Sequence, residues 1–130
     1  MNTQIEVSLP AAPVSVREAR DAVAEIAAKA GAPRRVIEDI RLCVSEAVAN
    51  VVRHAYRRND GDLTMTVERD ASDLLVVVRD DGVGLNGFQR DGDLGYGLRI
   101  IEQLAGRCSI TSAPNAGTEV RMVFDLDTDD

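Results

Sequence analysis

The chain has 130 residues, 45% of them hydrophobic and 28% charged, with a formal net charge of −7. This composition is typical of one soluble globular domain and excludes an intrinsically disordered chain. The negative charge argues against a general binder of nucleic acid or of an anionic membrane, since either would need a cationic surface. The sequence has no signal-peptide pattern and no apolar run long enough for a membrane helix. We therefore expect a single cytoplasmic domain over residues 1–130.

A short strand and an amphipathic helix are expected first. The run I5-E-V-S-L9 alternates between apolar and polar residues and is followed by prolines, which predicts a strand that ends there. Ser15 and Glu18 form a capping-box pattern ahead of apolar residues at helical spacing, and Gly31 supplies a stop. These signals predict a helix that is capped by Ser15 and ends before Gly31.

A second, longer helix is expected after Pro33, which suits the first turn of a helix. It should end before N59-D-G61, a turn signal. Apolar residues at helical spacing mark its inner side, namely Val36, Ile37, Ile40, Val44, Ala47, Val48, Val51 and Ala55. Cys43, on this helix, and Cys108 lack any metal-ligand spacing and are predicted to be small buried thiols.

The second half of the chain predicts four strands and one helix. Residues 63–69 alternate as in a half-exposed strand, whereas the continuous apolar run over 74–79 predicts a strand covered on both faces. The later segments are a glycine-rich connection over 80–95, a third helix from Leu98 to Ala105, strands over 108–112 and 118–126, and a solvated acidic tail over about 125–130. Together the elements predict an α+β fold, a two-layer sandwich with helices on one face of a mostly antiparallel, mixed sheet.

Three polar residues interrupt the apolar pattern of the second helix at strict four-residue intervals. In E46-A-V-A-N50-V-V-R-H54, the side chains of Glu46, Asn50 and His54 stack on nearly the same helical face. Polar groups among buried valines are costly unless something hydrogen-bonds to them. We therefore expect a polar ligand against this face, whereas the nearby Arg53, Arg57 and Arg58 are expected on a solvated face.

Three glycine-containing motifs follow in the second half. D80-D-G-V-G84 comes directly after the apolar strand, G95-Y-G97 opens the third helix, and Gly117-Thr118 begins the last strand. An aspartate at a strand end can accept hydrogen bonds from a ligand amine, and glycines before a helix leave its free N–H groups available to phosphate. Each motif alone is also compatible with an ordinary turn or joint.

The order of these four motifs resembles that of the Bergerat-type ATP-binding fold. The pattern is E-x-x-x-N on a helix, D-x-G-x-G after a strand, G-x-G before a helix and G-T before a strand. The superfamily with this pattern includes gyrases, histidine kinases, the large heat-shock chaperone and mismatch-repair ATPases. The resemblance covers nearly the whole chain and implies that the chain binds ATP.

The resemblance also implies a role for each motif residue. Asn50 would ligate Mg²⁺ that bridges the nucleotide phosphates, since Mg²⁺ takes hard oxygen ligands and keeps several waters. Glu46 would be the general base near the γ-phosphate, and Asp80 would accept from the adenine amino group. The remaining residues would line the site: Gly82 and Gly84 at the adenine pocket, Gly95 and Gly97 at the phosphates, and Thr118 at the adenine end, often through water. His54 matches a common histidine of the small-kinase branch, although a structural hydrogen bond would explain it equally well.

Within the superfamily, the chain resembles the bacterial anti-sigma-factor serine-protein kinases. We expect neither a transducer domain nor a preceding dimerisation helix, and S45-E-A-V-A-N-V-V-R-H-A-Y56 is similar to the helix motif of that branch. Those proteins bind a sigma factor and phosphorylate a serine on an anti-anti-sigma protein of the STAS type. Resemblance alone also implies a homodimer, whereas the net charge and the missing signal and membrane segments are what predict a cytoplasmic protein with no direct binding of nucleic acid or membrane.

One alternative belongs to a different functional class. The connection over residues 85–94 is short for a nucleotide lid, and Asp93 stands where some relatives carry a basic residue near the γ-phosphate. An acidic residue there would repel the phosphate unless it points outward. The chain could therefore be a non-catalytic regulatory module that uses Mg·ATP as a ligand to control partner binding. A structural domain without any ligand would require all four motifs to be coincidental.

Overall fold

The computed structural model describes residues 3–55, 61–81, 99–112 and 117–126. Its strands are β1 (Thr3–Pro10), β2 (Asp62–Asp70), β3 (Asp73–Asp80), β4 (Arg107–Ser112) and β5 (Thr118–Asp125). Its helices are α1 (Pro13–Lys29) and α2 (Arg34–Asn50), the latter continued by a π-helical turn, η1 (Val51–Ala55). Residues 99–104 are also helical.

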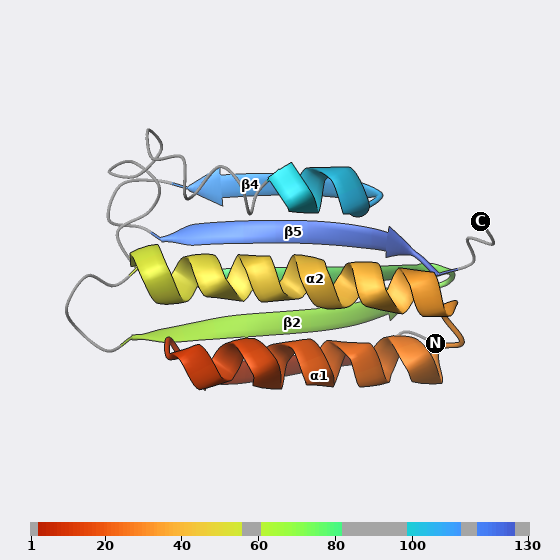
Figure 1. Ribbon diagram of the computed structural model, residues 1–130, viewed down its shortest axis with the longest axis horizontal. Helices are drawn as coiled ribbons and strands as arrows, with labels where there is room; N and C mark the ends of the chain where they lie inside the picture. The colour runs from red at the N-terminus through yellow and green to blue at the C-terminus, as the bar shows by residue number, and fades with distance from the viewer. Residues whose placement is uncertain (1–2, 56–60, 82–98, 113–116, 127–130) are drawn as a thin grey trace.

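The five strands form one sheet in the order β1-β2-β3-β5-β4, and all four pairings are antiparallel. The helices lie on one face of this sheet, with α1 and α2 side by side and the helical residues 99–104 in front of β4 (Figure 1). The predicted two-layer α+β sandwich is therefore confirmed. No helix among the described residues is both long and apolar enough to cross a membrane.

The predicted capping box at the start of α1 is wrong. The helix begins at Pro13, two residues before Ser15, and Ala12 precedes it in an extended conformation without any side-chain cap. Ser15 is fully buried within the first turn, where its hydroxyl donates to the carbonyl oxygen of Pro10 at 2.6 Å. Proline fits the first helical position because its φ is already helical and its missing N–H is not needed there. Pro13 therefore starts the helix, and Ser15 ties it to the end of β1.

Gly31 ends α1, as predicted. Its φ of 86° lies in the left-handed region, which glycine adopts at little cost. The N–H of Gly31 donates to the carbonyl of Ala28 at 3.0 Å, and the N–H of Ala32 donates to that of Ala27 at 3.1 Å. These two bonds form the Schellman motif, which satisfies carbonyl groups left free at the end of a helix.

The apolar side of α2 packs against the sheet, as its spacing predicts. The buried residues are Val36, Ile40, Cys43, Val44, Ala47 and Val48, all of which belong to one core with the helix-facing side chains of the sheet. Pro33 lies just before the helix, at the N-cap in an extended conformation, rather than within the first turn. Because α2 runs across β3 and β5, its C-terminal end is held at a defined place over the sheet.

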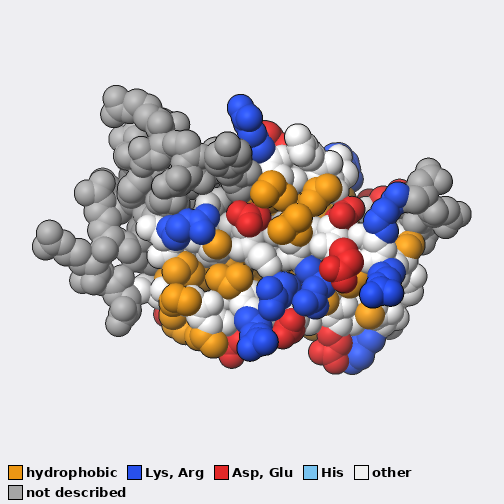
Figure 2. All heavy atoms as spheres, viewed as in Figure 1, with side chains coloured by type: hydrophobic (Ala, Val, Ile, Leu, Met, Phe, Trp, Pro, Cys, Tyr) orange, Lys and Arg blue, Asp and Glu red, His pale blue; other side chains and the backbone are white. Residues whose placement is uncertain are grey.

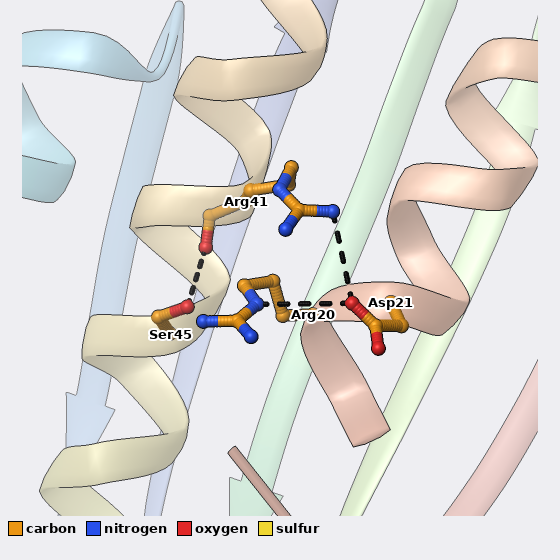
Figure 3. A network of polar contacts seen from close by, with 4 residues as sticks. All are labelled: Arg20, Asp21, Arg41 and Ser45. Carbon is orange, nitrogen blue, oxygen red and sulfur yellow. Dashed lines mark hydrogen bonds and ion pairs between the residues drawn. The ribbon is translucent and has the colours of Figure 1, made fainter. Parts of the chain in front are cut away.

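Polar contacts join α2 to α1 on the solvent side of the helix layer (Figure 3). Asp21 of α1 pairs with Arg41 of α2 at 3.7 Å and with its neighbour Arg20 at 3.8 Å. The hydroxyl of Ser45 donates to the carbonyl of Arg41 at 2.7 Å. Exposed ion pairs contribute little free energy, so the apolar contacts beneath hold the two helices together. Figure 2 shows basic and acidic side chains intermixed over this face.

The prediction that β3 is covered on both faces is only half right. Its helix-facing residues Leu74, Val76 and Val78 are buried, and the helices cover only this side among the described residues. On the opposite side Val77 is also buried and Leu75 is half-buried, but Arg79 is exposed. β3 is the central strand of the sheet, so side chains of β2 and β5 shield its second face without a second helix layer.

The predicted acidic tail begins later than expected. Leu126 is buried in the core, and its N–H donates to the carbonyl of Ser72 at 2.8 Å. Asp125 is the last residue of β5 and pairs in register with Asp73. Residues 127–130 lie outside the described residues.

Cys43 provides a test of the core that does not involve the site. Burial raises the pKa of its thiol from 9.0 to about 12, and the charges of Asp39, Cys108 and Glu46 act in the same direction. Below pH 9 the thiol is protonated in both the folded and the unfolded chain. Between pH 9 and 12 the unfolded chain loses a proton that the folded chain keeps, so the free energy of unfolding falls as pH rises.

We expect this contribution to be absent from a Cys43→Ala variant. Urea denaturation at pH 8 and at pH 10 should show that the wild type loses about 1 kcal/mol more than the variant between the two conditions. The same loss in both proteins would show that the thiol ionises equally in the folded and the unfolded chain. Cys108, which was also predicted to be buried, is only partly buried at the edge of the core. Burial also raises the pKa of its thiol, so Cys108 is kept in both proteins and its contribution cancels.

Candidate functional site

Three of the predicted motifs meet at one end of the sandwich. The C-terminal end of α2 and the start of β5 lie at the same end in Figure 1, and strand pairing brings the end of β3 to the start of β5. β3 and β5 are antiparallel neighbours, and Asp80 and Thr118 are direct register partners. Two residues that are 38 positions apart in the sequence therefore stand opposite each other, because the last residue of one strand pairs with the first residue of the other.

Asn50 is the last residue of α2 and is buried, with 9% of its surface exposed. Its side-chain oxygen Oδ1 accepts a hydrogen bond from Nη2 of Arg53 at 3.4 Å. Its side-chain nitrogen Nδ2 is buried and has no hydrogen-bond partner among the described residues. A buried amide N–H without a partner costs about 1–3 kcal/mol. A ligand that accepts a hydrogen bond from Nδ2 would remove this cost, whereas a cation would contact Oδ1 instead.

Glu46 lies four residues before Asn50 on the same helix and is half-buried. The four-residue spacing places both side chains on nearly the same face of α2. The carboxylate therefore lies one turn further from the end of the helix than the amide. This stacking, predicted from the spacing, provides an acceptor for a proton next to an oxygen ligand for a cation.

Asp80 is 5% exposed and is the last residue of β3. Alternation along the strand places it on the helix-facing side, in line with Val76 and Val78. A buried carboxylate is costly unless it is hydrogen-bonded, and such a group accepts hydrogen bonds from an amine. Thr118, its half-buried register partner, brings a hydroxyl group to the same place.

Gly117 is packed directly against Asp80, a feature that sequence analysis missed. A Cβ atom added to Gly117 would lie 1.9 Å from the carbonyl oxygen of Asp80 and 2.9 Å from the Cα of Asp81. Gly117 also has a φ of 85°. Sequence analysis recognised the Gly117-Thr118 motif but assigned a role only to Thr118. Pairing the start of the last strand with the end of β3 would have revealed the close approach.

The other predicted site residues lie outside the described residues. These are Gly82, Gly84, Gly95 and Gly97, together with Asp93 and the predicted lid over residues 85–94. Leu98, the expected first residue of the third helix, is also outside, whereas residues 99–104 are helical as predicted. The side chain of His54 is likewise not described. Arg53 is exposed, as expected of a solvated helix face, but its contact with Asn50 was not predicted.

The oxygen of Asn50 is a suitable ligand for Mg²⁺, which prefers hard oxygen ligands and retains waters. Within the described ranges, no group of three or more His, Cys, Asp or Glu side chains could hold a metal ion. A dedicated protein cage for a metal is therefore not present there. The available donor fits a cation held jointly by one amide, by water and by a phosphate-bearing ligand.

Two hollows in the described part of the chain lie away from these residues. One, of about 340 Å³, is on the face of the sheet opposite the helices and is lined by Leu75, Arg107, Arg121 and Val123 among others. The other, of about 480 Å³, lies between α1 and β1 and includes Ile26. Neither is lined by any of the predicted site residues, so neither adds to the candidate site.

The fold and the site together define an ATP-binding domain of the Bergerat type: helices on one face of an antiparallel sheet, with a polar helix end beside a buried strand-end aspartate. Residues 9–124 match the family described as histidine kinase-like ATPase domain, and the chain belongs to that family.

Individual relatives and structures agree with this assignment. The chain is 34% identical over 96 residues to the serine-protein kinase RsbW of Listeria innocua, an alignment that covers 73% of the chain and 61% of that relative. It is 27% identical over 115 residues to the anti-sigma F factor of Clostridium acetobutylicum, with 80% of each covered. The crystal structure of the RsbU and RsbW domains of Rv1364c from Mycobacterium tuberculosis superimposes with a TM-score of 0.76 and 24% identity over 95% of this chain and 32% of that one. At this identity the structural match concerns the fold.

Proposed function

We propose that the chain is an ATP-dependent serine-protein kinase and anti-sigma factor, which phosphorylates a serine on an anti-anti-sigma partner of the STAS type. The observation that carries the proposal is the meeting of Asn50, Asp80 and Thr118 at one end of the fold, with the side-chain nitrogen of Asn50 buried and without a hydrogen-bond partner in the described part of the chain. The names of the two relatives, a serine-protein kinase and an anti-sigma factor, support the choice of activity and partner.

In this proposal, the two ends of the nucleotide are held by different layers of the fold. Asp80 accepts a hydrogen bond from the adenine amino group, and Thr118 supports the same end. Asn50 provides its amide oxygen as a ligand to Mg²⁺, which offsets the charge of the phosphates when bound. The glycines Gly82 and Gly84 shape the adenine pocket, and Gly95 and Gly97 offer backbone N–H groups to the phosphates.

Glu46 is the proposed general base of an in-line phosphoryl transfer. The serine hydroxyl of the partner attacks the γ-phosphorus, and Glu46 takes the hydroxyl proton as the new O–P bond forms. The bond between the γ-phosphorus and the bridging oxygen breaks, and ADP leaves. The position of Glu46 one turn before Asn50 supports this role because both side chains lie on nearly the same face of α2.

Phosphorylation would switch which partner the protein holds. A sigma factor is one partner and the anti-anti-sigma protein is the other, which places the protein in the cytoplasm with its targets. We further propose that the functional unit is a homodimer and that the single ATPase domain spans residues 1–130. The alignment covers 61% of the length of the Listeria relative. The activity, the partners and the domain bounds are therefore proposed for this chain alone.

Asn50→Ala is expected to remove the Mg²⁺-dependent part of nucleotide binding. Isothermal calorimetry should show saturable ATP binding to the wild type that strengthens with Mg²⁺, and weak binding to the variant that Mg²⁺ changes by less than about twofold. Removing even an outer-shell partner of a metal ligand typically costs about 10–100-fold in metal affinity, so loss of the proposed ligand itself should cost at least about tenfold. Gln4→Ala, which removes an exposed amide on β1, is the matched control. Retention of the full Mg²⁺ effect by Asn50→Ala would exclude Asn50 as the metal ligand.

A second experiment distinguishes the proposed kinase activity from the alternative, a non-catalytic regulatory module that uses Mg·ATP to control partner binding. The protein is incubated with γ-labelled ATP, Mg²⁺ and a candidate anti-anti-sigma protein. Label on a serine of the partner supports the kinase. A complex that requires nucleotide but acquires no label supports the module, and would replace the proposed activity with ATP-controlled partner binding.

A further inference from the structure

The contact between Arg53 and Asn50 joins a charged, exposed residue to a buried amide. Nη2 of Arg53 donates to Oδ1 of Asn50 at 3.4 Å. Asn50 closes α2, and Arg53 lies three residues later in the π-helical turn η1. Such turns depart from the regular helical repeat, and they are frequent at functional sites. Within the described residues, the donor to the Asn50 side chain is therefore a permanent cation.

The acceptor of this hydrogen bond is Oδ1 of Asn50, the same atom that would ligate Mg²⁺ in the proposed function. The amide has two ends, and its nitrogen is buried without a partner among the described residues. Its oxygen is therefore the end that faces the exposed guanidinium, and it is also the end that could ligate Mg²⁺. A guanidinium and a divalent cation cannot both lie against one oxygen at low cost, because two cations at about 4 Å repel each other even when exposed to water.

We propose that Arg53 competes with Mg²⁺ for Oδ1 of Asn50, and so sets the Mg²⁺ dependence of nucleotide binding. Without metal, the guanidinium donates a hydrogen bond to the amide oxygen. Metal can bind Asn50 only after displacing the guanidinium, which remains nearby as a positive charge. Arg53 is thus a positioning residue that weakens the metal contribution, and this inference rests on the proposed function of Asn50.

Three variants test the competition by comparing ATP affinity with Mg²⁺ and with EDTA. The measured quantity is the dissociation constant of ATP in EDTA divided by the dissociation constant of ATP in Mg²⁺. Any effect of Arg53 that is common to both conditions cancels in this ratio. Arg53→Gln removes the charge, and its ratio should exceed that of the wild type by about tenfold. Arg53→Lys keeps the charge, and its ratio should stay within about threefold of the wild type. Arg34→Gln removes an exposed arginine at the other end of α2 and should leave the ratio unchanged.

The outcomes distinguish a failure of the proposed competition between Arg53 and Mg²⁺ from a failure of the proposed ATP-binding function. An equal ratio in Arg53→Gln and wild type, whether or not both affinities fall together, would overturn the competition while leaving ATP binding intact. A lysine variant that behaves like the glutamine variant would also overturn it, because the charge would not be the cause. If the wild type shows no saturable ATP binding, the proposed function fails and the inference fails with it. Thermal melting without nucleotide checks that each variant is folded.

Discussion

Glu46→Gln is expected to lower the rate of phosphoryl transfer by about 10²–10⁴-fold and to leave the affinity for Mg·ATP within about twofold of the wild type. The amide has nearly the same shape as the carboxylate, but it cannot accept the proton of the attacking serine. A positioned general base typically contributes a rate factor of this size. Single-turnover transfer of label from ATP to the partner measures the rate, and calorimetry measures the affinity.

The matched control for this variant is Glu38→Gln. Glu38 lies eight residues earlier on α2 and is exposed, so its replacement removes the same charge from the same helix but away from the site. It should leave both the rate and the affinity unchanged. Wild-type transfer by Glu46→Gln would remove Glu46 from the role of base. Loss of nucleotide affinity without a separate loss of rate would instead make it a binding residue.

Gly117→Ala is expected to destabilise the fold by about 3 kcal/mol and to weaken ATP binding by more than tenfold. The added Cβ would lie 1.9 Å from the carbonyl oxygen of Asp80, so the start of β5 and the end of β3 must move apart. The carbonyl belongs to the backbone, which yields less readily than a side chain. Because Thr118 follows at once and pairs with Asp80, the shift would also disturb the proposed adenine site. Urea denaturation and calorimetry measure the two effects.

Gly31→Ala provides a control for the conformational part of this effect. Gly31 has a φ of 86°, nearly the same as that of Gly117, but an added Cβ there meets nothing within 4 Å. An alanine in this conformation costs about 1–2 kcal/mol by itself. Gly31→Ala should therefore lose about that amount and keep full ATP affinity. Equal destabilisation by both variants, with ATP affinity retained, would show that the contact with Asp80 does not constrain the site.

The pairing of Asp80 with Thr118 shows why a set of weak motifs became one site. Each motif alone was compatible with a turn, and only their order and their resemblance to a known pattern suggested a common ligand. In the structure, α2, β3 and β5 bring three of the motif residues to one end of the sandwich. Assigning these residues to adenine, metal and proton transfer remains a prediction, which the variants above test.

Local sequence signals predicted the secondary structure where one physical effect dominates. Apolar residues at helical spacing identified the buried side of α2, and Gly31 marked the end of α1 because few other residues adopt its backbone conformation. The same approach failed at Ser15, where two signals competed. A serine in a capping-box pattern favours an N-cap, but Pro13 was already positioned to begin the helix, so the serine became a buried link to Pro10.

The sequence alone determined the class of the protein: the spacing of Glu46 and Asn50 and the order of the glycine motifs indicated both the two-layer fold and an ATP-binding family. Only the tertiary structure revealed the close contact of Gly117 with Asp80 and the hydrogen bond from Arg53 to Asn50. The physical reason is the range of the interactions. Helical spacing and turn conformations depend on neighbours within a few residues, whereas strand register brings Gly117 against Asp80 only on folding. The hydrogen bond from Arg53 to Asn50 joins residues only three apart, but it forms in the π-helical turn η1, which departs from the regular helical repeat.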